Sequence, residues 1–159
     1  MENSSAAGVR KIELKLPVLK MTDLPELTDV DSIRQLEIHF GPNVFLNSIG
    51  IRDWIRWIKP LAGKGGTSIF LHSCPETVIH LINMVSDFLP SNAEVLSFYL
   101  PFYSEQTGEI RKVLLKRGVD YTADNISLPT VKDQKGNSMQ MDVIEKKYFK
   151  FLKFPISSK

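Results

Sequence analysis

The sequence contains one cysteine, Cys74, among 159 residues, so no disulfide can form within the chain. A single thiol without a disulfide framework is typical of a reducing compartment, and we therefore expect a cytoplasmic protein. No stretch approaches the ~18 consecutive apolar residues of a membrane span. Residues 1–8 also lack an apolar run of the signal-peptide type. We expect neither export nor contact with a membrane.

The chain also lacks a large excess of either charge, because the formal net charge is only +2. This balance gives no strong electrostatic case for binding nucleic acid or an anionic membrane surface. Hydrophobic residues make up 43% of the chain and charged residues 24%, the proportions of an ordinary globular protein. The length suits one domain with a small appendage.

Recognisable catalytic and metal-binding patterns are missing. Cys74 with His39, His72 or His80 is the only nominal pair of nucleophile and base, and a buried, inert thiol explains Cys74 more simply. The three histidines lack the helix-face spacing of metal ligands. The glycine-rich segment 63–67 follows a helix and precedes a strand, the reverse of a phosphate-binding loop. We therefore expect no enzyme activity, no cofactor and no metal.

Hydrophobic periodicity predicts an α/β fold, with a mixed β-sheet packed against helices and a small C-terminal extension of a hairpin plus a helix. Strands are predicted at residues 9–19, 35–40, 44–46, 67–72, 93–103 and 110–117, and helices at 47–60, 73–89 and 142–153. The predicted organisation is a disordered tail at 1–8, a domain at 9–120, and a loop and helix at 121–159 that pack on it. Ser73 and Glu76 have the spacing of a capping box at the second helix.

The helix at 47–60 is the most clearly marked element. Asn47 or Ser48 can cap its N-terminus. One apolar stripe consists of Ile51, Trp54, Ile55 and Ile58. This stripe places Trp54 in the core and leaves Trp57 as an exposed aromatic residue.

Residues 44–51, Val-Phe-Leu-Asn-Ser-Ile-Gly-Ile, run directly into this helix and resemble the loop of STAS domains. In anti-sigma-factor antagonists that loop reads roughly Asp-Ser-Ser-Gly-Leu. The Cys74-Pro75 step, the Asn83-Met84 pair and the run 97–103 resemble a STAS-like subgroup of predatory and gliding bacteria. The final helix of that subgroup is matched here by Asp142, Glu145, Tyr148, Phe149 and Leu152. The resemblance spans about residues 9–154 and implies a STAS-like, non-catalytic bacterial signalling module that binds a partner protein.

In STAS domains the loop and the first long helix form the partner-binding face. Carried over by position, this face comprises Asn47, Ser48, Gly50, Arg52, Asp53, Arg56 and Trp57. Ser48 matches the serine that the antagonists phosphorylate, whereas Asn47 and Ile49 replace the motif's Asp and second Ser. The plainer interpretations are that Ser48 is a helix cap, and that Arg52 and Arg56 belong to an ordinary solvated face.

The same subgroup carries two Cys-x-x-Cys pairs after the last strand. Here Ser104 and Thr107 occupy the first pair, and Lys132 and Lys135 occupy the second. None of the four is a good zinc ligand, so zinc is not expected. We expect side-chain packing to hold the hairpin instead, with contributions from Tyr103, Leu115, Tyr148 and Phe151.

Two other functions stay open. STAS-like folds also hold nucleotides or small hydrophobic molecules, so a small-ligand sensor is the alternative to a partner-binding module. A homodimer through the final apolar strand or the C-terminal helix is a third possibility.

Overall fold

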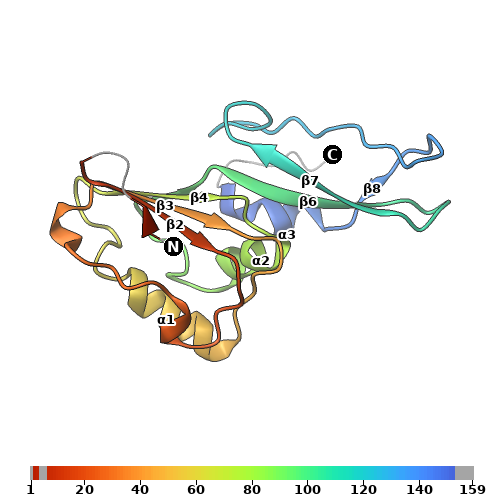
Figure 1. Ribbon diagram of the computed structural model, residues 1–159. Coiled ribbons are helices and arrows are strands. Elements are labelled where there is room, and N and C mark those ends of the chain that lie inside the picture. The colour runs from red at the N-terminus through yellow and green to blue at the C-terminus, as the bar shows by residue number, and fades with distance from the viewer. Residues whose placement is uncertain (1, 4–6, 153–159) are drawn as a thin grey trace.

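The computed structural model describes residues 2–3, as backbone, and residues 7–152. The described chain forms two β-sheets that meet at the end of the first sheet (Figure 1). The sequence prediction of an α/β fold is confirmed.

The first sheet has the strand order β1-β2-β3-β4-β5. Its strands are β1 (Glu2–Asn3), β2 (Val9–Leu14), β3 (Gln35–Phe40), β4 (Ser68–His72) and β5 (Ala93–Val95). Strands β2 to β5 are parallel, and β1 pairs antiparallel with β2 inside the segment for which the sequence predicts disorder. The connections contain the 3-10 turns η1 (Met21–Asp23) and η2 (Val30–Ser32) and the helices α1 (Ser48–Ile58) and α2 (Glu76–Met84).

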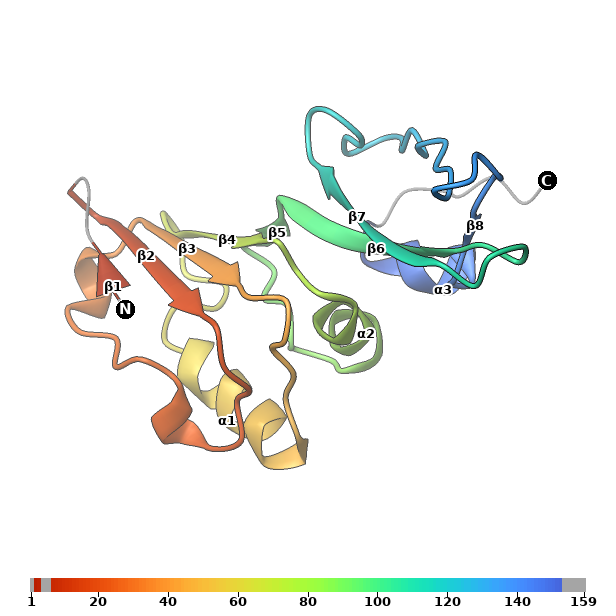
Figure 2. The same ribbon diagram turned by 45° about the vertical axis from the view of Figure 1, so that its right-hand side comes forward.

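Consecutive parallel strands are neighbours in this sheet, so right-handed crossovers place every connection on the same face. Figures 1 and 2 show α1 and α2 on that one side. The side chains of β3 alternate accordingly. Leu36, Ile38 and Phe40 are buried beneath the helices, whereas Glu37 and His39 are half-buried on the other face.

The second sheet has the order β7-β6-β8 and is antiparallel. It consists of β6 (Ser97–Tyr103), β7 (Ile110–Lys116) and β8 (Gln140–Met141), followed by α3 (Glu145–Tyr148) and the 3-10 turn η3 (Phe149–Leu152). Phe98 on β6 is fully buried at its centre. Its ring lies 5.0–6.1 Å, between centroids, from the rings of Tyr121, Tyr148, Phe149 and Phe151.

The strand predicted at 93–103 divides into β5 and β6, which belong to different sheets. Leu96 is the pivot between them. Its N–H donates to Leu71 O of the first sheet, and its carbonyl accepts from Arg117 N beside the second sheet. A predominantly apolar run does not show which neighbour each part of it pairs with.

Some predicted strands, helices and caps are confirmed and others are wrong. The predicted hairpin is confirmed by β6 and β7, whereas the strand predicted at 44–46 is a single bridge between Leu46 and Val18. The predicted capping box at α2 is wrong: Pro75 is the N-cap, and Ser73 has a positive φ of 55°. Helix α2 ends at Met84 instead of residue 89, and the C-terminal helix is short, continuing as η3 up to residue 152. The last residue of that predicted helix, 153, lies outside the described residues.

Hydrogen bonds, and not packing alone, join the two loops at the positions of the missing cysteine pairs. Asp133 is buried between them, and its carboxylate accepts from Ser104 Oγ at 2.6 Å and from Thr107 Oγ1 at 3.2 Å. It also accepts from the N–H groups of Lys135 and Asn137, both at 2.9 Å. The expectation of packing was thus incomplete: Leu115, Tyr148 and Phe151 are buried, but Asp133 links the loops.

Candidate partner-binding surface

Two loop segments run side by side at the C-terminal edge of the first sheet. Residues 16–19 follow β2 and residues 44–50 lead into α1. Val18 N donates to Phe45 O at 2.9 Å, and Val18 and Leu46 form a parallel bridge. Both Val18 and Leu46 are buried, which anchors the pair of loops to the core.

Gly50 permits this close approach. A Cβ built on Gly50 would lie 1.9 Å from the carbonyl oxygen of Val18. No side chain fits there, so the glycine that the STAS resemblance places at the partner face is in fact a packing position. Gly50 is buried and contributes no side chain to the surface.

The N-terminus of α1 is capped by Asn47. Its Oδ1 accepts from Gly50 N at 2.7 Å, which satisfies one of the free N–H groups of the first turn. This resolves the choice between Asn47 and Ser48 as the cap. Ser48 is the first residue of the helix and is exposed.

Both segments carry large apolar side chains that are exposed. Leu16 is 77% exposed, Phe45 45% and Ile49 47%. Leu19, 43% exposed, lies in the same segment as Leu16. A group of exposed apolar residues on neighbouring segments is a common mark of an interaction site, whereas single exposed residues need no explanation.

The exposed face of α1 is basic. Helix α1 and Lys59 together carry three cations, Arg52, Arg56 and Lys59, and one acid, Asp53. Asp53 is buried, and its Oδ1 lies 3.2 Å from Arg52 Nε and 3.9 Å from Arg56 Nη1. One carboxylate thus faces two guanidinium groups, and positive charge remains on the exposed face of α1.

The structure separates the sequence-predicted site residues into two groups. Asn47, Ser48, Arg52 and Arg56 are exposed, whereas Gly50, Asp53 and Trp57 are buried. The prediction that Trp57 is exposed is wrong. Only 8% of Trp57 is exposed, and its Nε1 donates to Pro25 O at 2.6 Å because the loop containing η1 covers that side of α1.

Sequence reasoning missed Leu16 and Phe45. Their signal was weak, since each belongs to a predicted strand in which an apolar residue is ordinary. Leu16 lies beyond the end of β2, and Phe45 alternates with the buried Val44 and Leu46. The exposure of both side chains becomes evident only once the structure shows where the strands end.

Two of the three histidines, His39 and His72, are brought together by the first sheet. His39 at position 5 of β3 is the register partner of His72, the last residue of β4. Their rings stack with a centroid distance of 4.1 Å and an interplanar angle of 5°. The pairing depends on the register of β3 and β4, and the sequence signals only that each histidine lies near the end of a strand. Helix-face spacing was the wrong test for residues on strands.

Cys74 is fully buried and lies beside β6, where it forms a parallel bridge with Phe98. Burial raises the pKa of its thiol far above the usual range. An accessible thiolate nucleophile is therefore not available at this position.

An apolar groove of ≈ 570 Å³ lies between α2 and the C-terminal segment. The exposed side chains of Met84 and Ile144 line it, together with His80 and Tyr148. Asn83 at its wall donates from Nδ2 to Tyr148 O at 2.9 Å, and its buried Oδ1 has no hydrogen-bond partner. This groove is the one place in the described chain where a buried side-chain acceptor is left unpaired.

Among residues 2–3 and 7–152, no helix is both long and apolar enough to cross a membrane. Comparisons of the chain with protein-family models, curated proteins and solved structures found no match. The proposals below therefore rest on the chain's own geometry and on its sequence resemblance.

Proposed function

We propose that this chain is a non-catalytic bacterial regulatory module of STAS-like fold that binds a partner protein in the cytoplasm. One observation carries the proposal: two adjoining segments at the N-terminus of α1, residues 16–19 and 45–49, both carry exposed apolar side chains. This is the part of the chain whose sequence resembles the STAS loop. The binding surface is defined here as Leu16, Phe45, Ile49, Ser48, Arg52 and Arg56.

The chemistry of this surface favours a partner that is apolar at its centre and acidic at its rim. Leu16, Phe45 and Ile49 provide apolar contact area, which is the main source of affinity in protein interfaces. Arg52 and Arg56 add exposed guanidinium groups that suit carboxylates. Binding should therefore weaken as the salt concentration rises.

Ser48 offers a point of regulation. A phosphate there would stand at the start of an 11-residue helix, where the free N–H groups and the helix dipole favour an anion. It would also reverse the local charge beside Arg52. Phosphorylation of Ser48 should therefore weaken binding to an acidic partner.

The decisive experiment compares affinity capture from extracts of the source cells by three forms of the chain. One variant, Phe45→Ser with Ile49→Ser, removes the apolar centre of the surface. The control, Ile110→Ser with Val119→Ser, removes two exposed apolar side chains from the second sheet and its following loop. Capture by the wild type and the control, with loss in the first variant, supports the proposal. Equal capture by all three forms rules this surface out.

Charge reversal of both arginines is a poor test, because Asp53 would remain buried beside two new carboxylates. Arg56→Gln leaves Arg52 to pair with Asp53, and so changes the charge without that penalty. The captured partner, once purified, should bind Arg56→Gln more weakly than the wild type at low salt, and the difference should shrink in high salt.

A small-ligand sensor is the second candidate, and the groove between α2 and the C-terminal segment favours it. Its lining combines the apolar side chains of Met84, Val143 and Ile144 with polar groups that include His80 and Asn83. A panel of nucleotides and apolar metabolites would raise the thermal midpoint if one of them binds. Ile144→Asp should abolish that shift, and no shift across the panel would exclude this candidate.

A further inference from the structure

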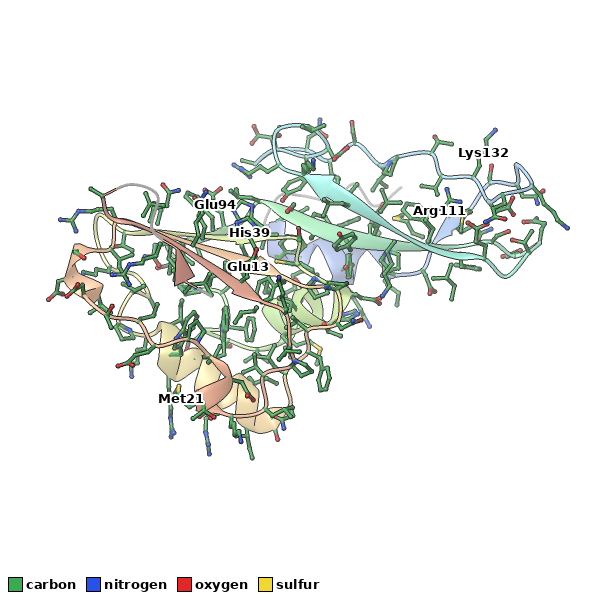
Figure 3. The ribbon with its side chains drawn as sticks, in the orientation of Figure 1. Glu13, Met21, His39, Glu94, Arg111 and Lys132 are labelled. Carbon is green, nitrogen blue, oxygen red and sulfur yellow. The ribbon has the colours of Figure 1, made fainter. Side chains whose placement is uncertain are left out.

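The face of the first sheet opposite α1 and α2 carries polar side chains on adjacent strands. In register across β2, β3 and β4 lie Glu13, His39 and His72, and beside His39 on the same face lies Glu37. Figure 3 labels Glu13, His39 and Glu94 along this side of the sheet. Because helices cover only the other face, these side chains face solvent or a ligand.

Glu37, His39 and His72 form a close cluster. Each offers one ligand atom, and these three atoms lie within 4.8 Å of one another. His72 Nε2 and Glu37 Oε1 are 2.9 Å apart. In the described part of the chain, no other group of three His, Cys, Asp or Glu side chains meets this criterion.

The backbone explains why the cluster forms. Residues two apart on a strand point to the same face, so Glu37 and His39 are neighbours along β3. His72 is opposite His39 on the next strand, about 4.8 Å away in the direction of the hydrogen bonds. Two ligands from one strand and a third from its neighbour therefore converge on rigid elements, which position ligands better than loops do.

We propose that Glu37, His39 and His72 form a binding site for a divalent transition-metal ion of the zinc class. Two imidazole nitrogens and one carboxylate oxygen match the ligands of zinc. Calcium and magnesium prefer ligands that are all oxygen, so this set does not suit them. Water from the open side of the sheet completes the coordination. Because three protein ligands leave a position free, the ion can also accept a donor from a bound molecule.

Binding requires a small rearrangement. Metal–ligand bonds of about 2.0–2.2 Å place tetrahedral ligand atoms roughly 3.3–3.6 Å from one another, so the separations within the cluster must change, and His72 Nε2 and Glu37 Oε1, now 2.9 Å apart, must move slightly away from each other. The two imidazole rings are nearly parallel, and lone pairs in parallel planes do not converge on one ion. The rings must therefore tilt, which χ rotations of half-buried side chains allow without movement of the strands.

The chain supplies a matched control for this site. His80 and Glu76 on α2 form another His–Glu pair, with Nε2 and Oε2 3.3 Å apart, but without a second histidine. If any His–Glu pair bound zinc, His80→Gln would weaken binding as much as His72→Gln. A site of three ligands predicts that only His39→Gln, His72→Gln and Glu37→Gln have an effect.

The test is calorimetric titration of the tag-free, metal-stripped full chain with Zn²⁺, and absorption spectroscopy with Co²⁺. We expect one ion per chain with micromolar or tighter affinity, and a loss of about tenfold or more in His39→Gln and His72→Gln. His80→Gln should bind as the wild type does. Circular dichroism without metal verifies that each variant is folded.

Nuclear magnetic resonance of the histidine side-chain nitrogens gives a second readout. Zn²⁺ should shift the ring nitrogens of His39 and His72 and leave those of His80 unchanged. Absence of binding up to about 100 μM Zn²⁺, where affinity would be too weak to matter in cells, overturns the proposal. Equal binding by the wild type and His39→Gln overturns it as well, and leaves the cluster as a hydrogen-bonded link between β3 and β4.

Discussion

Ser104 donates its hydroxyl proton to the carboxylate of Asp133 across 2.6 Å, joining the turn after β6 to a loop 29 residues further along the chain. Thr107 donates to the same Asp133 oxygen. The sequence resemblance matches Ser104 and Thr107 to a pair of cysteines. At these positions a carboxylate that accepts several hydrogen bonds links the two loops.

Replacing Asp133 with alanine should destabilise the chain, because the N–H groups of Lys135 and Asn137 and the hydroxyl of Ser104 lose their acceptor together. Thermal unfolding measures the effect. Asp124→Ala, in an exposed part of the same long loop, is the control and should change the midpoint far less. Equal midpoints for the two variants would show that Asp133 does not hold the loops together.

The contribution of Asp133 should depend on pH. Hydrogen bonds from Ser104, and then from Asn137 and Lys135, lower the pKa of Asp133 well below its ordinary value of 3.8, against the effect of desolvation. In acid the unfolded chain therefore takes up a proton at this residue before the folded chain does. The stabilisation is complete above about pH 5 and is lost as the pH falls below about 4 towards the folded pKa.

Urea unfolding from about pH 2.5 to 7 measures this dependence in the wild type and in Asp133→Asn. The difference in unfolding free energy should be constant at neutral pH and shrink in acid. A difference that grows as the pH falls would contradict the assignment.

Cys74 should be unreactive in the folded protein. Its side chain is fully buried and burial raises its thiol pKa, so both access and thiolate are lacking. Ellman's reagent should react roughly a hundredfold or more slowly with the native chain than with the chain in urea. Reaction at the unfolded rate would show instead that the helix start around Cys74 opens readily.

The contrast between α1 and the histidine cluster shows what the sequence could predict. The apolar stripe of α1 and the cap at Asn47 are local features, and both are present in the structure. The pairing of His39 with His72 depends on the register of two strands separated by α1, which no local pattern encodes. The exposure of Phe45 and the burial of Trp57 depend in the same way on where other segments pack.

The change from β5 to β6 was unpredictable for a related reason. Residues 95–103 are rich in aromatic and aliphatic residues that favour strands, and propensity does not state which neighbour a strand pairs with. Leu96 divides the run because its N–H bonds to the first sheet and its carbonyl bonds beside the second. Likewise, the resemblance drew attention to Ser104 and Thr107, but their common acceptor, Asp133, became evident only from the fold of the long loop.

Gly50 provides the last test, because it separates packing from binding at the proposed surface. Alanine has the higher helix propensity, so Gly50→Ala in an open helix would be stabilising by about 1 kcal/mol. Here the added Cβ would lie 1.9 Å from Val18 O, a backbone atom, so the loop containing residues 16–19 must move away from α1. We expect a net destabilisation of roughly 2–4 kcal/mol, measured by urea unfolding.

Gly65→Ala is the matched control, since nothing lies within 4 Å of its Cβ and its φ is not positive. That variant should be neutral or more stable by up to about 1 kcal/mol, because alanine reduces the entropy of the unfolded chain. If Gly50→Ala is as stable as Gly65→Ala, the close contact between residues 16–19 and α1 does not exist, and the proposed binding surface loses the contact that joins its two segments.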